Sequence, residues 1–252
     1  MNNKRIIARI DVKNEFAIKG IHLEGLRKVG DPNEMAIKYY KQGVDEIIFM
    51  DAVAAYYDRN SLSDLIVKAT KNVFVPITVG GGIRTLNDIS IALKSGADKV
   101  AINTQAVRSP EFINEAASIF GSQCIVASVD AKIIGSGKWE VYVDNGREPA
   151  GVDVVEWVER LEILGAGEIM LTSIDREGTK KGFDEPLITA IASKISIPLT
   201  VCGGAGNQDH IESVLSVQGV NAVALASVLH YDLLQIDGLK KSLDDNNVEV
   251  RI

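Results

Sequence analysis

The 252-residue chain is short of several residue types, and each shortage excludes a class of protein. Its two cysteines, Cys124 and Cys202, are too few for a disulfide framework and lie in apolar or glycine-rich runs. We therefore expect free, buried thiols and a cytoplasmic location. The three histidines, His22, His210 and His230, show no metal-ligand spacing, so no metal site is predicted.

Long apolar runs and blocks of basic charge are also missing. No run approaches the roughly 18 apolar residues of a membrane span, and the opening MNNKRIIARIDVKN returns to charge too soon for a signal peptide. The net charge is −7. We expect neither a membrane nor a nucleic acid as partner. The 46% hydrophobic and 24% charged residues are typical of a globular protein.

The chain does contain eight short apolar runs rich in β-branched residues. They are IIARI (6–10), EIIFM (46–50), VPITV (75–79), KVAIN (99–103), CIVASV (124–129), EIMLT (168–172), IPLTV (197–201) and AVALA (222–226). Stretches with helical apolar spacing separate most of them, such as 88–94 before Gly96 and 154–164 before Gly165. Alternation of this kind predicts parallel strands and a single (β/α)8 barrel over residues 1–252. A doubly wound open sheet fits less well, because no GxGxxG follows the first run.

The second half of the chain repeats the first at a nearly constant offset, which is 119 residues between Asp11 and Asp130, 122 between Gly43 and Gly165, and 123 between Gly96 and Gly219. The matched segments are IIARIDVK with CIVASVDAK, GVDEIIFM with GAGEIMLT, TVGGGI with TVCGGAG, and GADKVAINT with GVNAVALAS. Four matches in the same order predict two half-barrels, about residues 1–121 and 122–252.

Glycines and small polar residues follow the third and fourth runs of each half. The candidates are Gly81, Gly82, Asn103 and Thr104 in the first half and Gly203, Gly204, Ala226 and Ser227 in the second. Such strand ends bind phosphate at the upper face of a barrel, because small residues let backbone N–H groups approach an anion. Two sites on opposite sides predict a bisphosphate ligand. The alternative is that the glycines only serve tight turns.

Asp11 and Asp130 end the first strand of each half. A carboxylate there is costly to bury unless it is paired or takes part in chemistry. Two of them between two phosphate sites favour general acid–base catalysis. The alternative is that each caps a loop or pairs with Lys13 or Lys132. Secondary candidates for substrate contact on the same face are Asp51, Thr172 and Asp175.

A set of longer motifs covers nearly the whole chain. They are KRIIARIDV, KG at 19–20, TVGGGIRT, GADKVAINT, FGSQCIV, Asp130-Ala131-Lys132, GAGEIMLTSIDREGTKKGFD and CGGAG. In these the chain resembles the cyclase subunits of imidazole glycerol phosphate synthase, from histidine biosynthesis. The resemblance implies a bisphosphate substrate, Asp11 and Asp130 as the catalytic pair, and Lys19 on a mobile loop that closes over the substrate. It also implies that ammonia from a separate glutaminase adds to the substrate, after which the chain is cleaved and the imidazole ring closes. No cofactor is expected.

Four charged residues begin strands at the lower end of the predicted barrel. They are Arg5, Glu46, Lys99 and Glu168. Two cations and two anions could close a ring of salt bridges, and in the family the matching four form a gate at the ammonia entrance. Ordinary stabilisation of the lower face is the alternative. Neither cysteine lies in a nucleophile pattern, so we expect the glutaminase to be a separate subunit docked on this face.

Some segments depart from the histidine-pathway pattern. Arg9 stands where these proteins usually have cysteine. The other differences are the segment MDAVAAYYDRNSL (50–62), which contains Tyr56 and Tyr57, the segment YVDNGREPAG (142–151), and Cys202. The departures resemble a paralogous branch linked to bacterial surface-sugar amidation, in which the barrel delivers ammonia to a third protein. Three hypotheses therefore stay open: a full cyclase, an ammonia-delivery subunit, and a sister sugar-phosphate isomerase that needs no gate. Retention of Asp11, Lys19 and Asp130 favours the cyclase.

Overall fold

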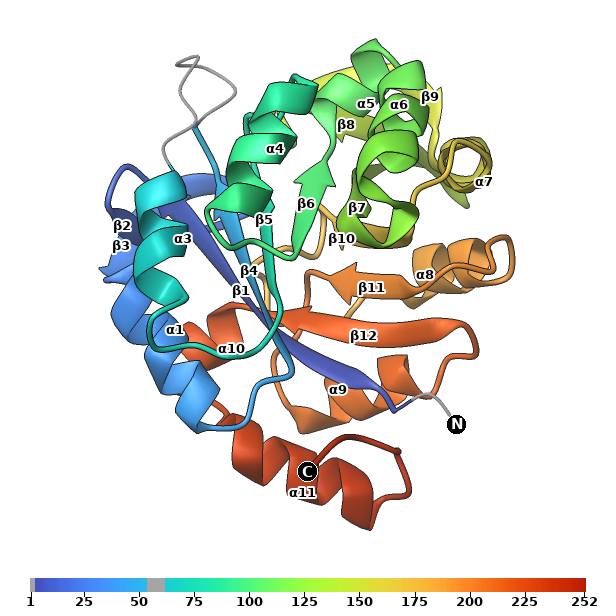
Figure 1. Ribbon diagram of the computed structural model, residues 1–252. Helices are drawn as coiled ribbons and strands as arrows, with labels where there is room; N and C mark the ends of the chain where they lie inside the picture. The colour runs from blue at the N-terminus through green and yellow to red at the C-terminus, as the bar shows by residue number, and fades with distance from the viewer. Residues whose placement is uncertain (1–2, 54–61) are drawn as a thin grey trace.

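A closed barrel of parallel strands forms the centre of the computed structural model, which describes residues 3–53 and 62–252 (Figure 1). Its eight strands are β1 (Arg5–Lys13), β4 (Glu46–Asp51), β5 (Ile77–Gly80), β6 (Lys99–Ile102), β7 (Ile125–Gly135), β10 (Glu168–Ser173), β11 (Leu199–Cys202) and β12 (Val220–Leu225). Each pairs in parallel with the next in this order, and β12 pairs with β1 to close the barrel. The predicted (β/α)8 barrel is confirmed, and each apolar run overlaps one of these strands.

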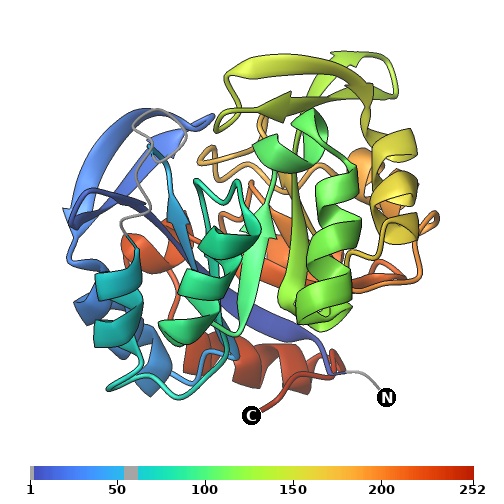
Figure 2. The same ribbon diagram turned by 45° about the horizontal axis from the view of Figure 1, so that its top comes forward.

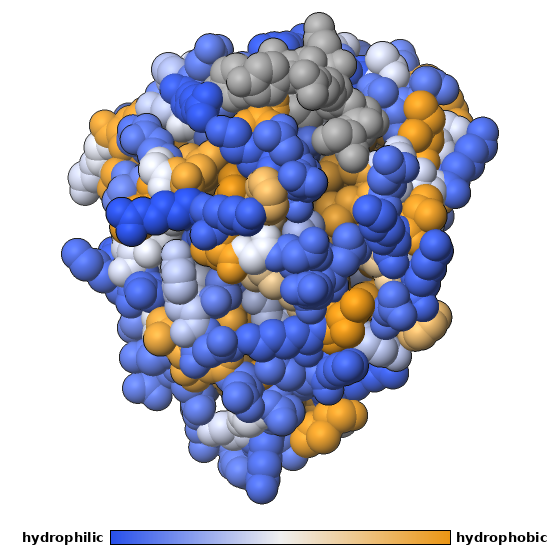
Figure 3. All heavy atoms as spheres, turned by 90° about the vertical axis from the view of Figure 1, so that its left-hand side faces the viewer, coloured by the Kyte–Doolittle hydropathy of each residue, from blue (hydrophilic) through white to orange (hydrophobic). Residues whose placement is uncertain are grey.

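Helices cover the outside of the barrel. They are α1 (Pro32–Lys41), α3 (Ser63–Ala69), α4 (Leu86–Lys94), α5 (Thr104–Arg108), α6 (Glu111–Phe120), α7 (Val154–Ile163), α8 (Glu185–Ala192), α9 (Gln208–Leu215), α10 (Ser227–His230) and α11 (Ile236–Asp245), with a 3₁₀ turn at Ser122–Cys124. Side-chain caps fix several starts, such as the capping box of Thr85 and Asp88 at α4. On the face shown in Figure 3, polar side chains predominate around small apolar spots, as expected where amphipathic helices face water.

Apolar side chains form two layers, because successive residues of a strand point to opposite sides. Ile6, Ala8 and Ile10 of β1 join the larger cluster between strands and helices, while Ile7 joins the cluster inside the barrel. The inner cluster consists of Ile7, Ile48, Ala101, Val126, Met170, Cys202, Ala222 and Ala224, with Met50 packed against it. The middle of the barrel is therefore apolar between two polar ends.

Two hairpins, which the sequence analysis did not predict, extend barrel strands at their carboxyl ends (Figure 2). β2 (Phe16–Ile21) and β3 (Glu24–Gly30) follow β1, and β8 (Lys138–Val143) and β9 (Glu148–Asp153) follow β7. The turns of the hairpins touch: a Cβ on Gly146 would lie 2.7 Å from Leu23 Cδ1. The hairpins therefore meet over the upper face. Their matching positions after β1 and β7 support the predicted half-barrels, which stay a prediction.

Three smaller predictions concern the cysteines, membranes and the tyrosine segment. Both cysteines are free; Cys202 is buried and Cys124 is half-buried. Among the residues that the structure describes, no helix has the length and apolar character needed to cross a bilayer. Tyr56 and Tyr57 lie outside the described residues.

Candidate active site

Asp11 and Asp130 lie at the upper ends of β1 and β7, and each is 6% exposed. Asp11 Oδ1 accepts a hydrogen bond from Arg9 Nε at 2.9 Å. Asp130 Oδ2 accepts one from Asn103 Nδ2, also at 2.9 Å. The two predicted catalytic carboxylates thus have different partners, a cation for Asp11 and an amide for Asp130. The alternative, in which Asp11 pairs with Lys13 and Asp130 with Lys132, is not needed to explain why these carboxylates are buried.

This difference moves the pKa values of the two carboxyls in opposite directions. Burial raises the pKa of Asp130, and neither the charge of Arg9 nor the hydrogen bond from Asn103 overcomes that effect. Burial acts on Asp11 in the same sense, but the nearby cations Arg9 and Lys19 outweigh it and bring the pKa of Asp11 below its usual value. The pair therefore combines a carboxylate that stays ionised with a carboxyl that holds its proton more readily. A general base and a general acid need these two states.

Arg9 lies where the barrel interior meets the upper site, and it is 4% exposed. Besides its bond to Asp11, its guanidinium donates to Thr172 Oγ1 at 3.1 Å. Burial opposes the charge, but Asp11 and other acidic neighbours raise the pKa of Arg9. Arg9, which stands where the histidine-pathway proteins usually have cysteine, is therefore an ionised part of the site. Its hydrogen bond fixes the orientation of Asp11.

The first predicted phosphate site forms a pocket at the ends of β5 and β6. Gly81, Gly82, Asn103 and Thr104 all line it, together with Asp130. Gly81 and Gly82 have φ angles of 92° and 73°, which favour glycine. A Cβ on Gly81 would lie 2.2 Å from the carbonyl oxygen of Asp51. The backbone conformation therefore favours glycine at both positions, and the close approach of β4 adds a second reason at Gly81.

The second predicted site follows the neighbouring strands β11 and β12. Gly203 and Gly204 again have positive φ angles, 90° and 112°. Ser227 comes directly after Ala226 at the end of β12 and is 7% exposed. Ser227 lines a second pocket, whose other lining residues include Lys19, Arg27, Lys180 and Tyr231. Three cations and one carboxylate, Glu24, line this pocket, so its described lining carries a net positive charge, as anion binding requires. Gly203, Gly204 and Ala226 are not among its lining residues.

Lys19 lies within strand β2 and is 3% exposed, so the expectation of a loop position is wrong for this conformation. Its ammonium pairs with the carboxylate of Glu177, 158 residues further along the chain. Burial lowers the pKa of Lys19 to about 8. The backbone also holds the hairpin down, since His22 N donates to Glu177 O at 2.8 Å. The hairpin therefore lies closed over the site.

The secondary candidates divide into two groups. Thr172 is fully buried and contacts Arg9, so it belongs to the site. Asp51 lines the first pocket. Asp175 is not brought to either pocket: its carboxylate accepts from Ile133 N at 2.8 Å and lines a separate depression beside His22. The reason is that Asp175 lies two residues beyond the end of β10, where the turn directs it toward β7.

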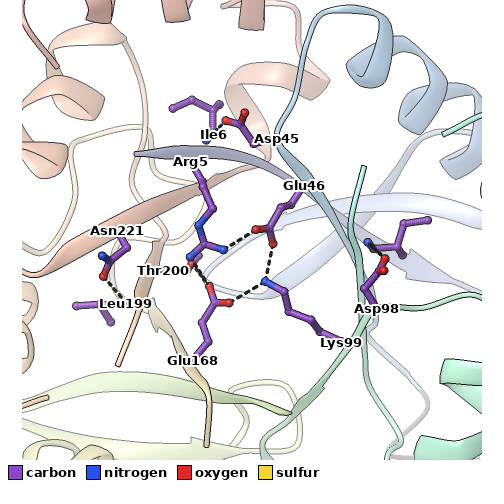
Figure 4. Close-up of polar contacts among 11 residues, drawn as sticks. Arg5, Ile6, Asp45, Glu46, Asp98, Lys99, Glu168, Leu199, Thr200 and Asn221 are labelled. Carbon is purple, nitrogen blue, oxygen red and sulfur yellow. Dashed lines mark hydrogen bonds and ion pairs between the residues drawn. The ribbon is translucent and has the colours of Figure 1, made fainter. Parts of the chain in front are cut away.

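Four charged side chains form a closed ring at the opposite end of the barrel (Figure 4). Arg5 donates to Glu46 at 2.5 Å and to Glu168 at 2.9 Å, and Lys99 donates to the same two carboxylates at 2.8 and 2.9 Å. Thr200 Oγ1 adds a bond of 2.6 Å to Glu168. Although burial opposes ionisation, Arg5 and Lys99 lower the pKa of Glu168. The ring predicted from strand starts is therefore present, with all its charges paired.

Comparison with known proteins places this site in a family. The family model described as histidine biosynthesis protein matches residues 5–235. The chain belongs to this family. Imidazole glycerol phosphate synthase subunit HisF of Legionella pneumophila is 56% identical over 206 residues, covering 82% of this chain and 97% of that protein. The subunit of the same name from Hydrogenobaculum sp. (strain Y04AAS1) is 46% identical over 249 residues, covering 99% of both chains.

Two residues of this histidine biosynthesis family member were missed in the sequence analysis. Glu177 lies inside the quoted motif GAGEIMLTSIDREGTKKGFD, but no local pattern indicates that it pairs with Lys19. His230 lies on α10, and its Nδ1 is 2.8 Å from the hydroxyl of Tyr39. Burial lowers the pKa of His230 to about 4, so this imidazole is neutral near pH 7. In the described residues no group of three His, Cys, Asp or Glu side chains is arranged to hold a metal ion.

Proposed function

We propose that this chain is an ammonia-dependent cyclase subunit of imidazole glycerol phosphate synthase. Its substrate would be a bisphosphorylated ribulosyl aminoimidazole-carboxamide, and its products imidazole glycerol phosphate and the aminoimidazole-carboxamide ribotide. The observation that carries the proposal is the placement of two buried carboxyls, Asp11 with a lowered pKa and Asp130 with a raised pKa, beside two candidate phosphate pockets.

The proposed chemistry assigns one proton transfer to each carboxyl. Ammonia adds to the carbonyl carbon of the ribulosyl chain, the new nitrogen loses a proton to Asp11, and the carbonyl oxygen leaves as water. The nitrogen then forms the C–N bond that closes the imidazole ring, while the C–N bond to the carboxamide ribotide breaks and Asp130 donates a proton to the departing amine nitrogen. Arg9 keeps Asp11 ionised, and Asn103 holds Asp130 in place. The closed β2–β3 hairpin, anchored through Lys19, limits access of water to the intermediates.

The names of the relatives agree better with the cyclase than with an ammonia-delivery subunit or a sugar-phosphate isomerase. The experiment that tests the proposal is turnover of the bisphosphate by the chain alone with an ammonium salt. Rates that rise with free ammonia would support the cyclase. Binding of the substrate without turnover would favour ammonia delivery.

The proposal includes a glutaminase subunit that docks on the lower face, around the ring of Arg5, Glu46, Lys99 and Glu168. The apolar cluster inside the barrel lies between this ring and Arg9, so a neutral molecule such as ammonia would meet few groups that compete for it. A sheltered path is useful because most ammonia is ammonium at neutral pH. The ring closes the lower end of that path and must open for ammonia to pass.

We expect Lys99→Ala to separate the two nitrogen sources. The variant leaves Glu46 and Glu168 with Arg5 as their remaining cation in the ring. The ratio of glutamine-driven to ammonia-driven turnover should fall by about 2- to 30-fold, the range for a lost coupling between sites. The reason is that only ammonia from the glutaminase has to pass the disturbed ring, whereas added ammonia can enter from the upper face. Both rates should be measured in the complex with the glutaminase.

The matched control is Lys71→Ala, which removes the same charge from an exposed position between α3 and β5. It should leave the ratio unchanged. If Lys99→Ala reduced both rates equally, the ring would only stabilise the barrel. A melting temperature recorded for each variant separates that outcome from unfolding.

A further inference from the structure

Asp144, in the turn between β8 and β9, places a carboxylate in the first phosphate pocket. Its backbone N–H donates to Thr104 Oγ1 at 3.0 Å, and its Oδ1 lies 3.4 Å from the same hydroxyl. Its Oδ2 pairs with Arg108 at 3.1 Å. Thr104 and Arg108 are groups that a phosphate in this pocket would need, since hydroxyl and guanidinium donors bind phosphate well. A residue of the protein itself already holds both.

The position of Asp144 is fixed by the fold. Asp144 and Asn145 have φ angles of 50° and 59°, a conformation that is rare for residues other than glycine. Gly146, next in the turn, packs against Leu23 and Ile174, where a Cβ would lie 2.7 and 3.2 Å from their side chains. Asp144 is 7% exposed. The turn therefore fixes the backbone of Asp144, and its carboxylate can leave the pocket only by rotation of the side chain.

Among the lining residues that the structure describes, the formal charges of the side chains cancel. The lining cations are Arg9, Arg84 and Arg108, and the lining carboxylates are Asp51, Asp130 and Asp144. A phosphate that carries close to two negative charges binds weakly where no net positive charge awaits it. Two buried atoms of the described pocket residues, Asn103 Oδ1 and Asn145 Nδ2, have no hydrogen-bond partner. Of these two atoms only Asn145 Nδ2 is a donor, so it is the one that a ligand oxygen could satisfy.

We propose that Asp144 is a specificity-determining residue that acts as an internal anion in the first phosphate pocket. It occupies Thr104 and Arg108 in the free protein, and a ligand phosphate must displace its carboxylate. A lone phosphate gains too little to do so. A bisphosphate gains additional binding energy at the second pocket, so the competition favours ligands that engage both ends. This inference rests on the proposed function for its assignment of a phosphate to the pocket.

The test is the affinity for inorganic phosphate, measured by titration calorimetry in Asp144→Asn. The substitution keeps the shape of the side chain and removes its charge. We expect phosphate to bind about tenfold more tightly, as the loss of one nearby negative charge predicts. The gain should disappear in the double variant Asp144→Asn/Thr104→Val, which lacks the hydroxyl. Glu148→Gln, an exposed position of the same hairpin, is the control for a general change of charge.

Three outcomes would overturn the inference. These are unchanged phosphate affinity in Asp144→Asn, weaker affinity, or an equal gain in Glu148→Gln. The proposed function is tested separately, by turnover of the wild-type chain. Tighter phosphate binding by a variant of a chain without turnover would uphold the role of Asp144 and reject the cyclase. Turnover by the wild-type chain, together with unchanged phosphate affinity in Asp144→Asn, would uphold the cyclase and reject the role of Asp144.

Discussion

Asp11→Asn and Asp130→Asn should each reduce ammonia-dependent turnover by about 10²–10⁴-fold, the usual contribution of a general acid or base. Both variants keep the size of the side chain, and both remove the proton-transfer group. The loss should appear in kcat, since both carboxyls are assigned to proton transfer. Near-wild-type rates in both variants would show that the acid–base assignment is wrong.

The same two substitutions should have opposite effects on stability. The pKa of Asp11 is lowered in the folded protein, so its ion pair with Arg9 stabilises the fold above the unfolded pKa and the contribution is lost as the pH falls. Asp11→Asn should therefore lower the free energy of unfolding near pH 7. The pKa of Asp130 is raised, so ionisation of this buried group opposes folding near pH 7. Asp130→Asn should leave the free energy of unfolding unchanged or increase it.

Urea denaturation at neutral and acidic pH checks this difference. The effect of either substitution should shrink as the pH falls below the relevant carboxyl pKa values, because both wild-type groups are then protonated. Equal destabilisation by both variants at neutral pH would contradict the different ionisation states assigned to the pair.

Replacing Arg9 by methionine should be the most destabilising change in the site. It leaves the buried carboxylate of Asp11 without its cation, and breaking a buried pair in this way costs about 3–5 kcal/mol. Burial then dominates at Asp11 and raises its pKa, so the acid limb of the pH–rate profile should move to higher pH. Chemical denaturation gives the first quantity, and kcat/KM across the pH range gives the second.

A double-mutant cycle provides the control for Arg9. In Arg9→Met/Asp11→Asn both charges are absent, so the loss of stability should be smaller than the sum of the two single losses. Arg9→Lys keeps the charge and should preserve most of the pH profile. Additive losses would mean that Arg9 contributes by packing alone.

The sequence predicted those parts of the fold that depend on local pattern. Apolar β-branched runs marked each barrel strand, because both faces of such strands are buried. The ring residues were found because Arg5, Glu46, Lys99 and Glu168 each begin a strand, and parallel strands bring their first residues to one end of a barrel. Asp11 and Asp130 were found for the same reason at the other end.

What the sequence analysis missed depends on contacts between distant segments or on turn geometry. The β8–β9 hairpin was missed although Asp144-Asn145-Gly146 is a turn sequence, because the alternation of strands and helices took precedence. The pair of Lys19 and Glu177 joins residues from different halves of the chain. Asp175 was placed in the site because it follows a strand. The direction of the turn after β10, which carries Asp175 toward β7, cannot be predicted from the sequence pattern.

The most direct test of the account follows a labelled nitrogen through the reaction. The chain alone is given the bisphosphate and ¹⁵N-ammonium at a pH where free ammonia is present, and both products are analysed by mass spectrometry. The cyclase proposal predicts one ¹⁵N in each imidazole glycerol phosphate and none in the ribotide, with Asp11→Asn and Asp130→Asn yielding little of either. Substrate that binds but stays intact and unlabelled, with wild-type protein and ample ammonia, would contradict it.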